Sequence, residues 1–222
     1  MKIIIPVKSS STRVENKNFK EFWNGFSLTD ILLQKLSFKE KKDIYISSED
    51  PKKEKYANRY GCNFLLRDKK LCDNDTPLPE VIRGIVKQIP EEYEEIAWCQ
   101  VTDPMFNEHE KAFLEWEKNK EKYDSLCVVY PFKKYILNSD HIPINFGFGN
   151  WHVKSQNLKN FYDMTFTFSI LKKECIEKCG YHIGVKPYWY NASNVHVDID
   201  TKEDFEIASI IYDRKIKNET II

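Results

Sequence analysis

The sequence predicts an α/β fold in which helices cover a mostly parallel sheet. Short runs rich in β-branched residues alternate with amphipathic segments along the chain, and this alternation is typical of parallel strands joined by helices. No repeat, low-complexity tract or linker divides the 222 residues, of which 41% are hydrophobic. Because a chain of this size and composition can bury its own core, we expect a single domain over 1–222.

Strands and helices are expected to alternate through the first 130 residues. The opening β-branched run predicts a strand over 2–7, and apolar residues at helical spacing predict a helix over 27–36. Further strands are expected at 43–47, 62–66, 95–101 and 125–130, and further helices at 51–60, 79–88 and 108–120. This order favours a parallel sheet buried between helices.

The pattern changes after Pro131, where an irregular segment begins. We interpret 132–160 as an inserted excursion that serves the substrate site or dimerisation. Regular structure is expected to resume with a strand at 164–171 and a helix that ends at Cys179. The aromatic stretch at 188–193 is interpreted as core or dimer surface. The later elements are then a strand through 194–200 and a closing helix from Lys202 to about Lys215.

Charge and hydropathy disfavour several classes of function. The chain carries 34 basic and 34 acidic residues, so its overall charge gives no reason to expect a nucleic-acid or acidic-membrane partner. No apolar run approaches the roughly 20 residues that span a bilayer. The opening run is too short and too quickly polar for a signal peptide. We therefore expect a cytoplasmic protein that binds neither nucleic acid nor membrane.

The first candidate site is the loop after the first strand, because ligands of α/β sheets bind at the carboxyl ends of the strands. The chain reads IIIPVKSSSTRVENKN over 3–18. This loop offers Lys8, Arg13 and Lys17, three serine hydroxyls and consecutive backbone N–H groups that could bind an anion. It matches neither the dinucleotide-binding nor the P-loop pattern. A solvated basic turn is the competing interpretation.

The second candidate is the acidic segment DIDTKEDFEIA, which begins at Asp198. Asp198 and Asp200 lie two residues apart at the end of a predicted strand, so both carboxylates are expected on one face. There a divalent cation could join them to phosphate oxygens. Thr201 and Asp204 also resemble a helix capping box. That interpretation accounts for the start of the last helix but not for Asp198.

Two more strand ends carry polar residues. The stretch WCQVTDPMF places Gln100 and Asp103 where a nucleotide or metal could bind, although Asp-Pro is also common in turns. The stretch LLRDKKLCDNDTPLPEVI places Arg67 after a strand and Thr76 just before a helix. For these two residues a surface charge and a helix cap are the competing interpretations.

Taken together, these segments resemble the bacterial cytidylyltransferases that activate acidic sugars. These are the CMP-sialic acid (acylneuraminate) synthetases and the related CMP-Kdo synthetases, whose opening motif is I-P-A-R-x-x-S-K-x-x-x-x-K-N. The resemblance extends along the whole chain and implies a Rossmann-like, three-layer nucleotidyltransferase fold of the GT-A-like kind. The matching segments are IPVK at 5–8, ST at 11–12, KN at 17–18, YISSEDPKKEKYANRYGCNFLLR at 45–67, Gln100 and VDIDTKEDFEIA at 197–208.

The resemblance implies a reaction in which an acceptor oxygen attacks the α-phosphorus of CTP, releases pyrophosphate and leaves a CMP ester for surface glycan synthesis. Charge stabilisation by cations and Mg²⁺, the implied cofactor, would supply most of the catalysis. The implied partners are CTP, an acidic acceptor and a second subunit, because family members are commonly dimers that share the acceptor site.

Residue roles follow from the same resemblance. The catalytic residues would be Lys8, Lys17, Asp198 and Asp200. The two aspartates would also hold Mg²⁺, with Asp103 as a candidate third ligand. The implied nucleotide-binding residues are Val7, Ser9, Ser10, Ser11, Asn18, Arg67, Thr76 and Gln100.

The chain departs from the family pattern in both halves. Lys8 replaces an arginine, which keeps the charge but loses a planar grip on phosphate. Where the family has T-S-P-L-R after the glutamine, this chain has TDPMF at 102–106, so the arginine is missing. The acceptor region aligns poorly, and its candidate contacts are Trp151, His152, Lys154 and Gln156. The acceptor is therefore expected to be a nonulosonic-acid-like sugar or a small phosphorylated or phosphonate compound. A non-catalytic nucleotide-binding protein that kept the fold is the other alternative.

Overall fold

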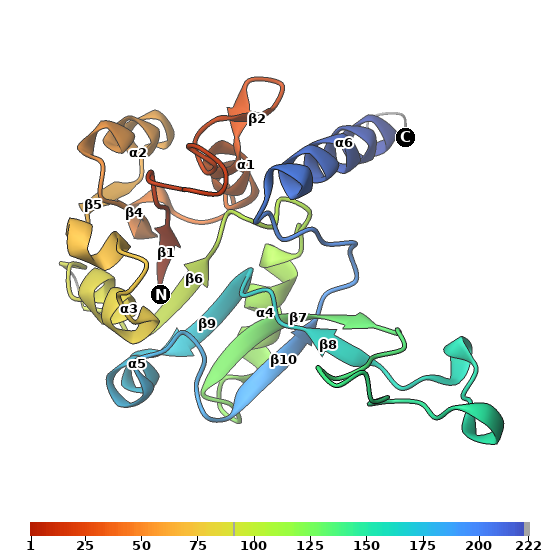
Figure 1. The fold of residues 1–222 in the computed structure, drawn as a ribbon. Coiled ribbons are helices and arrows are strands. Elements are labelled where there is room, and N and C mark those ends of the chain that lie inside the picture. Colours follow the sequence, from red (N-terminus) through yellow and green to blue (C-terminus); the bar gives the residue numbers. More distant parts are fainter. Residues whose placement is uncertain (91, 220–222) are drawn as a thin grey trace.

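The computed structural model describes residues 1–90 and 92–219 of the chain. Within them, eight strands form the main sheet in the order β10-β7-β9-β6-β1-β4-β5, with β8 paired to β7 (Figure 1). The strands are β1 (Lys2–Pro6), β4 (Ile44–Ser48), β5 (Asn63–Leu66), β6 (Glu95–Cys99), β7 (Ser125–Phe132), β8 (Phe161–Asp163), β9 (Phe168–Lys172) and β10 (Pro187–Asn191).

The sheet is mixed, with mostly parallel strands, as the alternation of elements predicts. β1 pairs in parallel with β4 and β6, β4 with β5, and β7 with β10. β9 lies between β6 and β7 and runs antiparallel to both. The carboxyl ends of β1, β4, β5 and β6 consequently meet at one edge of the sheet, which is where a ligand site is expected.

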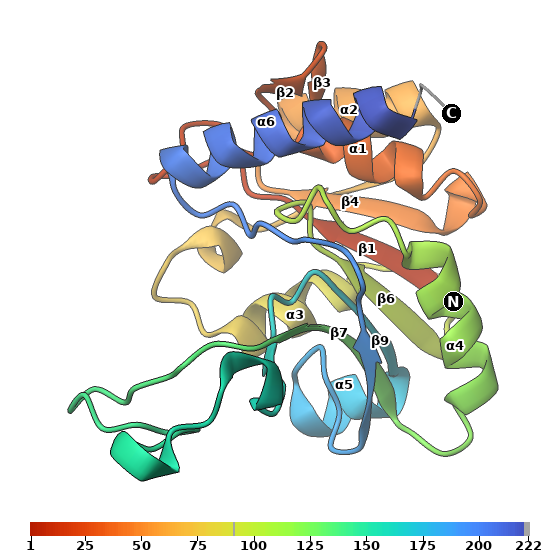
Figure 2. The ribbon, with the colours of Figure 1, turned by 90° about the vertical axis from the view of Figure 1, so that its right-hand side faces the viewer.

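Helices cover both faces of this sheet and give the three layers that the resemblance implies (Figures 1 and 2). On one face α1 (Leu28–Lys35), α2 (Glu54–Tyr60), α4 (His109–Asn119) and α6 (Lys202–Glu219) pack around a core that includes Ile5, Ile46 and Val128. On the other face α3 (Leu78–Val86) and α5 (Lys173–Cys179) pack against Ile4, Tyr45 and Trp98. Because successive residues of a strand point to opposite faces, Ile4 and Ile5 belong to different cores.

Local sequence signals set the ends of several helices. Ser27 begins α1 through a capping box with Asp30. Gly61, at φ 68°, ends α2 in the left-handed conformation that favours glycine. The predicted capping box of α6 is confirmed, because Thr201 N donates to Asp204 Oδ2 over 2.8 Å and Asp204 N donates to Thr201 Oγ1 over 3.1 Å.

One sequence-based expectation was wrong, and one small element was missed. The strand expected at 194–200 does not form, and the last strand is β10, within the aromatic stretch before it. Tyr190 of β10 is buried and pairs with Val128 of β7, whereas the later segment has no neighbouring strand. The sequence reading also missed a small hairpin of β2 (Glu21–Trp23) and β3 (Phe26–Ser27). Its Asn24-Gly25 turn has the positive φ angles that tight hairpins require.

Residues 133–160 leave the sheet between β7 and β8 as an extended arm (Figures 1 and 2). Tyr135 OH donates to the carbonyl of Val153, and the side chain of Asn145 bridges Ile136 N and Lys134 O, so the arm is held by contacts of its own. Across the described ranges, no helix has the length and apolar character needed to cross a membrane.

Candidate active site

The loops at the carboxyl ends of β1, β5 and β6 surround a cavity of about 480 Å³. The loop after β1 supplies most of its wall, and the residues after β6 supply the opposite side. This position agrees with the strand-end rule for α/β sheets. The lining residues are Pro6, Lys8, Ser10, Ser11, Thr12, Arg13, Lys17, Asn18, Asn74, Gln100, Val101 and Thr102.

Three cations of the opening loop face this cavity. Lys8 Nζ donates to Asn74 Oδ1 over 2.9 Å and so joins the loop to the segment after β5. Arg13 Nη2 and Lys17 Nζ lie 2.9 and 3.6 Å from the same oxygen, Asp200 Oδ1. Burial lowers the pKa of Lys17, although the carboxylates of Asp200 and Asp198 oppose this change. The cluster is a local positive site in a chain with no net charge.

Asp198 and Asp200 reach the cavity from the far end of the sequence. Lys17 Nζ also donates to the carbonyl of Ile199, the residue between them. Desolvation raises the pKa of Asp198, repulsion from Asp200 adds to the rise, and a hydrogen bond from Thr102 opposes it. The two carboxylates therefore lie close to each other and to the cations, as the sequence predicts, although they do so without a strand.

Asp103, the candidate third metal ligand, is buried beneath the cavity. Its Oδ2 accepts hydrogen bonds from Tyr130 OH over 2.6 Å and from Thr167 Oγ1 over 3.0 Å, and its Oδ1 accepts from Met105 N over 3.2 Å. Both oxygens are thus already bound within the protein. In the structure Asp103 ties the loop after β6 to β7 and to the residue just before β9.

The carboxylate pair fits a magnesium ion by the chemistry of its donors. Mg²⁺ binds through one or two carboxylates together with substrate phosphates, and Asp198 and Asp200 offer such oxygens beside a cation-lined cavity. Among the residues that the structure describes, no three His, Cys, Asp or Glu side chains form a metal-holding group. Substrate phosphates, water or neutral oxygens of the chain would supply the remaining ligands of a magnesium held here.

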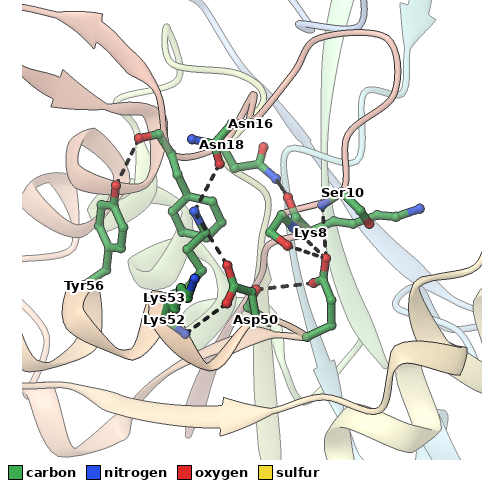
Figure 3. A network of polar contacts seen from close by, with 12 residues as sticks. Lys8, Ser10, Asn16, Asn18, Asp50, Lys52, Lys53 and Tyr56 are labelled. Atoms are coloured by element: carbon green, nitrogen blue, oxygen red, sulfur yellow. Dashed lines mark hydrogen bonds and ion pairs between the residues drawn. The ribbon is translucent and has the colours of Figure 1, made fainter.

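The start of the opening loop is held by Glu49, a residue that the sequence reading left out. Glu49 Oε1 accepts from Ser9 N, Ser9 Oγ and Ser10 N over 2.9, 2.7 and 3.1 Å. Figure 3 shows this loop beside the segment after β4: Ser10 N donates to Glu49, and Lys53 Nζ donates to Asn16 Oδ1 over 3.1 Å. The backbone N–H groups of Ser9 and Ser10, which were expected to bind an anionic ligand, therefore already bind the carboxylate of Glu49. Glu49 comes directly after a buried strand, and this position in the sequence could have indicated it as a candidate.

Arg67 also lies apart from the cavity. Its Nη2 donates to the carbonyl of Val7 over 3.0 Å and lies 3.7 Å from Glu49 Oε2. Thr76 Oγ1 donates to Lys70 O over 2.6 Å, and Pro77, not Thr76, occupies the cap position of α3. Arg67 and Thr76 thus support the loops around the cavity.

The structure brings six predicted residues to the cavity wall, with the two aspartates beside them. Asn18 Nδ2 donates to the carbonyl of Lys8 over 2.9 Å, while Thr29 Oγ1 donates to the carbonyl of Asn18, so this end of the loop is fixed as well. Gln100 follows β6 and is held by a bond from its N to Thr167 O. The six are Lys8, Ser10, Ser11, Lys17, Asn18 and Gln100.

The candidate acceptor contacts lie elsewhere. Trp151, His152, Lys154 and Gln156 are all exposed on the arm and do not line the cavity of their own chain. Trp151 is 80% exposed, which is unusual for so large an apolar side chain. Within one chain, therefore, the arm residues and the cavity do not form one site.

Comparison with known proteins finds a family whose model matches nearly the whole chain. The family model described as "Cytidylyltransferase" matches residues 2–220. The chain is 24% identical over 232 residues to a protein of Campylobacter jejuni named pseudaminic acid cytidylyltransferase, covering 98% of this chain and 97% of that protein. It is also 33% identical over 132 residues to a Helicobacter pylori protein named pseudaminic acid cytidylyltransferase and UDP-2,4-diacetamido-2,4,6-trideoxy-beta-L-altropyranose hydrolase. That match covers 58% of this chain and 26% of that protein.

The fold is shared with a solved structure of CMP:2-keto-3-deoxy-manno-octonic acid synthetase complexed with CTP. The TM-score is 0.64 at 10% sequence identity, and the match covers 96% of this chain and 98% of that one. The three-layer nucleotidyltransferase fold implied by the motifs is thereby confirmed.

Proposed function

We propose, from the premise that the chain belongs to the cytidylyltransferase family, that it transfers CMP from CTP to an acidic sugar of the nonulosonic-acid class and releases pyrophosphate. The observation that carries this proposal is the meeting of Lys8, Arg13 and Lys17 with Asp198 and Asp200 at one cavity. The product would be an activated precursor for surface glycan synthesis.

The triphosphate would bind along the later part of the opening loop. Lys8, Arg13 and Lys17 can offset its charge, and the hydroxyls of Ser11 and Thr12 can donate to its oxygens. Such a transfer depends mainly on positioning and on stabilising negative charge, and this cluster can provide both. Lys17 is held at an internal carbonyl and is only about a tenth exposed, so it is well placed to keep a fixed position.

Asp198 and Asp200 would hold Mg²⁺ and receive the proton of the acceptor. When bound, Mg²⁺ neutralises phosphate charge. A carboxylate oxygen of the pair that does not coordinate the ion could accept the proton of the attacking hydroxyl. Lys17 and Arg13 hold the carboxylate of Asp200 in place beside Asp198.

The acceptor class is inferred from the relatives. The C. jejuni and H. pylori proteins are both named for pseudaminic acid, and the first of them matches this chain along nearly its whole length. A small phosphorylated or phosphonate acceptor, and a binding protein without turnover, are the competing outcomes. The pair of carboxylates beside three cations favours an enzyme, since a protein that only binds CTP has little use for them.

We also propose that the arm, together with Phe132, mediates a homodimer. Phe148 and Trp151 are 68% and 80% exposed, and Ile142 and Ile144 near them are more than half exposed. Apolar side chains gathered on a projecting arm are typical of surfaces that bind another protein. In a dimer the arm of one subunit could bring the acceptor candidates, including Lys154 and Gln156, to the cavity of the other.

The decisive experiment incubates the protein with each of the four NTPs, MgCl₂ and a panel of acidic sugars that includes pseudaminic acid, and follows pyrophosphate release. We expect release with CTP and a nonulosonic acid only. Release with a phosphorylated acceptor alone would overturn the acceptor class. Binding of CTP without release from any acceptor would favour the non-catalytic alternative.

A further inference from the structure

Glu49 makes an unusual set of contacts for an acid beside a cation-lined cavity. One carboxylate oxygen receives two backbone N–H groups and one hydroxyl from Ser9 and Ser10. The other oxygen accepts from Ser48 Oγ over 3.3 Å and lies 3.7 Å from Arg67 Nη2. Glu49 is 8% exposed, and so its charge depends on these contacts in place of water.

Arg67 completes the arrangement from the other side of the loop. Its guanidinium joins Glu49 to the carbonyl of Val7, and the side chain is only 6% exposed. Val7 N in turn donates to Ser47 O at the end of β4. The segment from Val7 to Ser10 is thereby fixed at the carbonyl of Val7, at the N–H groups of Ser9 and Ser10, and at the Ser9 hydroxyl.

The contacts leave little room for a phosphate at the start of the loop. Consecutive N–H groups of this kind attract an anion, and here the anion is a carboxylate of the same chain. Ser9 and Glu49 line a separate cavity of about 430 Å³. The candidate active site is lined by the loop residues that follow, Ser10, Ser11, Thr12 and Arg13.

We infer that Glu49 is a positioning residue that stands in for a bound anion at the backbone N–H groups of Ser9 and Ser10, and that the triphosphate binds to the side chains that line the cavity and not to these two N–H groups. This inference rests on the proposed function. Glu49 carries a fixed negative charge that Arg67 compensates, so the cations further along the loop stay available for substrate. The alternative arrangement, in which phosphate displaces Glu49 from the loop, predicts the opposite effect of removing its charge.

The test compares Glu49→Gln with Glu54→Gln, which removes the same charge from an exposed position in α2. If Glu49 positions the loop, Glu49→Gln lowers kcat/KM for CTP by about tenfold, as expected for the loss of charge-assisted hydrogen bonds, and Glu54→Gln stays within about twofold of the wild type. An unchanged or higher affinity of Glu49→Gln for CTP would overturn the inference. That result is expected if Glu49 competes with phosphate for the loop, because removing its charge would then favour phosphate binding.

Two further measurements keep the inference testable if Glu49→Gln folds poorly or if no acceptor is found. Hydrogen exchange at the amides of Ser9 and Ser10 in the ligand-free wild type should be slow, and free exchange at both would overturn the inference without reference to activity. Ser9→Ala removes only the hydroxyl contact, so its loss of CTP affinity should be smaller than that of Glu49→Gln. An equal or larger loss would mean that Ser9 contacts the nucleotide directly. Absence of pyrophosphate release from the wild type would instead count against the proposed function alone.

Discussion

Replacing Lys17 with methionine tests the charge arrangement of the cavity most directly. Methionine keeps the length and apolar body of the side chain and removes only the ammonium group, which is 3.6 Å from Asp200 Oδ1. We expect Lys17→Met to lower kcat/KM for CTP strongly. The variant loses a cation that faces the triphosphate and leaves the repulsion between Asp198 and Asp200 less compensated.

The size of the effect follows from the distance and the exposure. A phosphate oxygen as far from the Lys17 ammonium as Asp200 Oδ1 is, 3.6 Å, would interact with it by roughly 4 to 5 kcal/mol at an effective dielectric constant of about 20. Asp200 is half exposed and Arg13 remains 2.9 Å away, so solvent and the second cation reduce this value. An estimate of about 2 to 3 kcal/mol corresponds to roughly a 30- to 150-fold loss in kcat/KM.

The assay is steady-state pyrophosphate release with CTP as the varied substrate, accompanied by thermal unfolding to show that the variant is folded. Lys20→Met is the matched control, because the Lys20 ammonium lies 3.8 Å from the ring centroid of Phe205 and does not line the cavity. The control is expected to keep the wild-type kcat/KM. A folded Lys17→Met protein within about threefold of the wild type would refute the assignment of Lys17 to the phosphate site.

Three further predictions address the other parts of the site. Asp198→Asn should lower kcat by about 100-fold or more while CTP binding persists, because it removes a proposed metal ligand and proton acceptor; titration of turnover with MgCl₂ measures this, and an unchanged MgCl₂ dependence would contradict it. Burial would raise the pKa of Glu49, but the hydrogen bonds from Ser9 and Ser10 together outweigh it and lower the pKa from 4.5 to about 2. The ionised Glu49 should therefore contribute about 3 kcal/mol to the free energy of unfolding above pH 4.5, and this contribution should disappear as the pH falls toward 2. In urea unfolding, the free energies of the wild type and Glu49→Gln should differ at pH 7 and converge as the pH falls from 4.5 toward 2. Trp151→Ala should shift the protein from dimer to monomer in sedimentation experiments, and an unchanged sedimentation coefficient would contradict the role of the arm.

Local patterns in the sequence were sufficient to predict most of the fold. The β-branched runs correspond to β1 and β4, the apolar run after Glu95 corresponds to β6, and capping residues such as Thr201 mark the helix start that the structure shows. These signals depend on neighbours in sequence. The antiparallel direction of β9 and the position of β10 depend instead on which strands meet in space, so the alternation of elements alone did not predict them.

The same distinction applies to the candidate site. Lys8, Lys17 and Gln100 follow strands and line the cavity, as strand-end reasoning predicts. Ser9 and Arg67 have equally suitable chemistry, but their partner is Glu49. The position of Glu49 after a buried strand marks it as a candidate in the sequence, but its contact with the loop depends on the packing of β4 beside β1.

The pair of aspartates shows how a correct expectation can rest on a wrong element. Alternation along an extended chain, and not membership of a sheet, places Asp198 and Asp200 on one side and Ile199 on the other. Ile199 is fully buried, its N donates to Thr102 O over 2.9 Å, and its carbonyl accepts from Lys17. A single apolar residue thus anchors both carboxylates between the loop after β1 and the end of β6. The precision of the site therefore depends on packing at Ile199 as well as on the charged groups themselves. Ile199→Ala keeps every charged group but should lower kcat. The space left by the missing side chain would allow the carboxylates of Asp198 and Asp200 to move relative to Lys17.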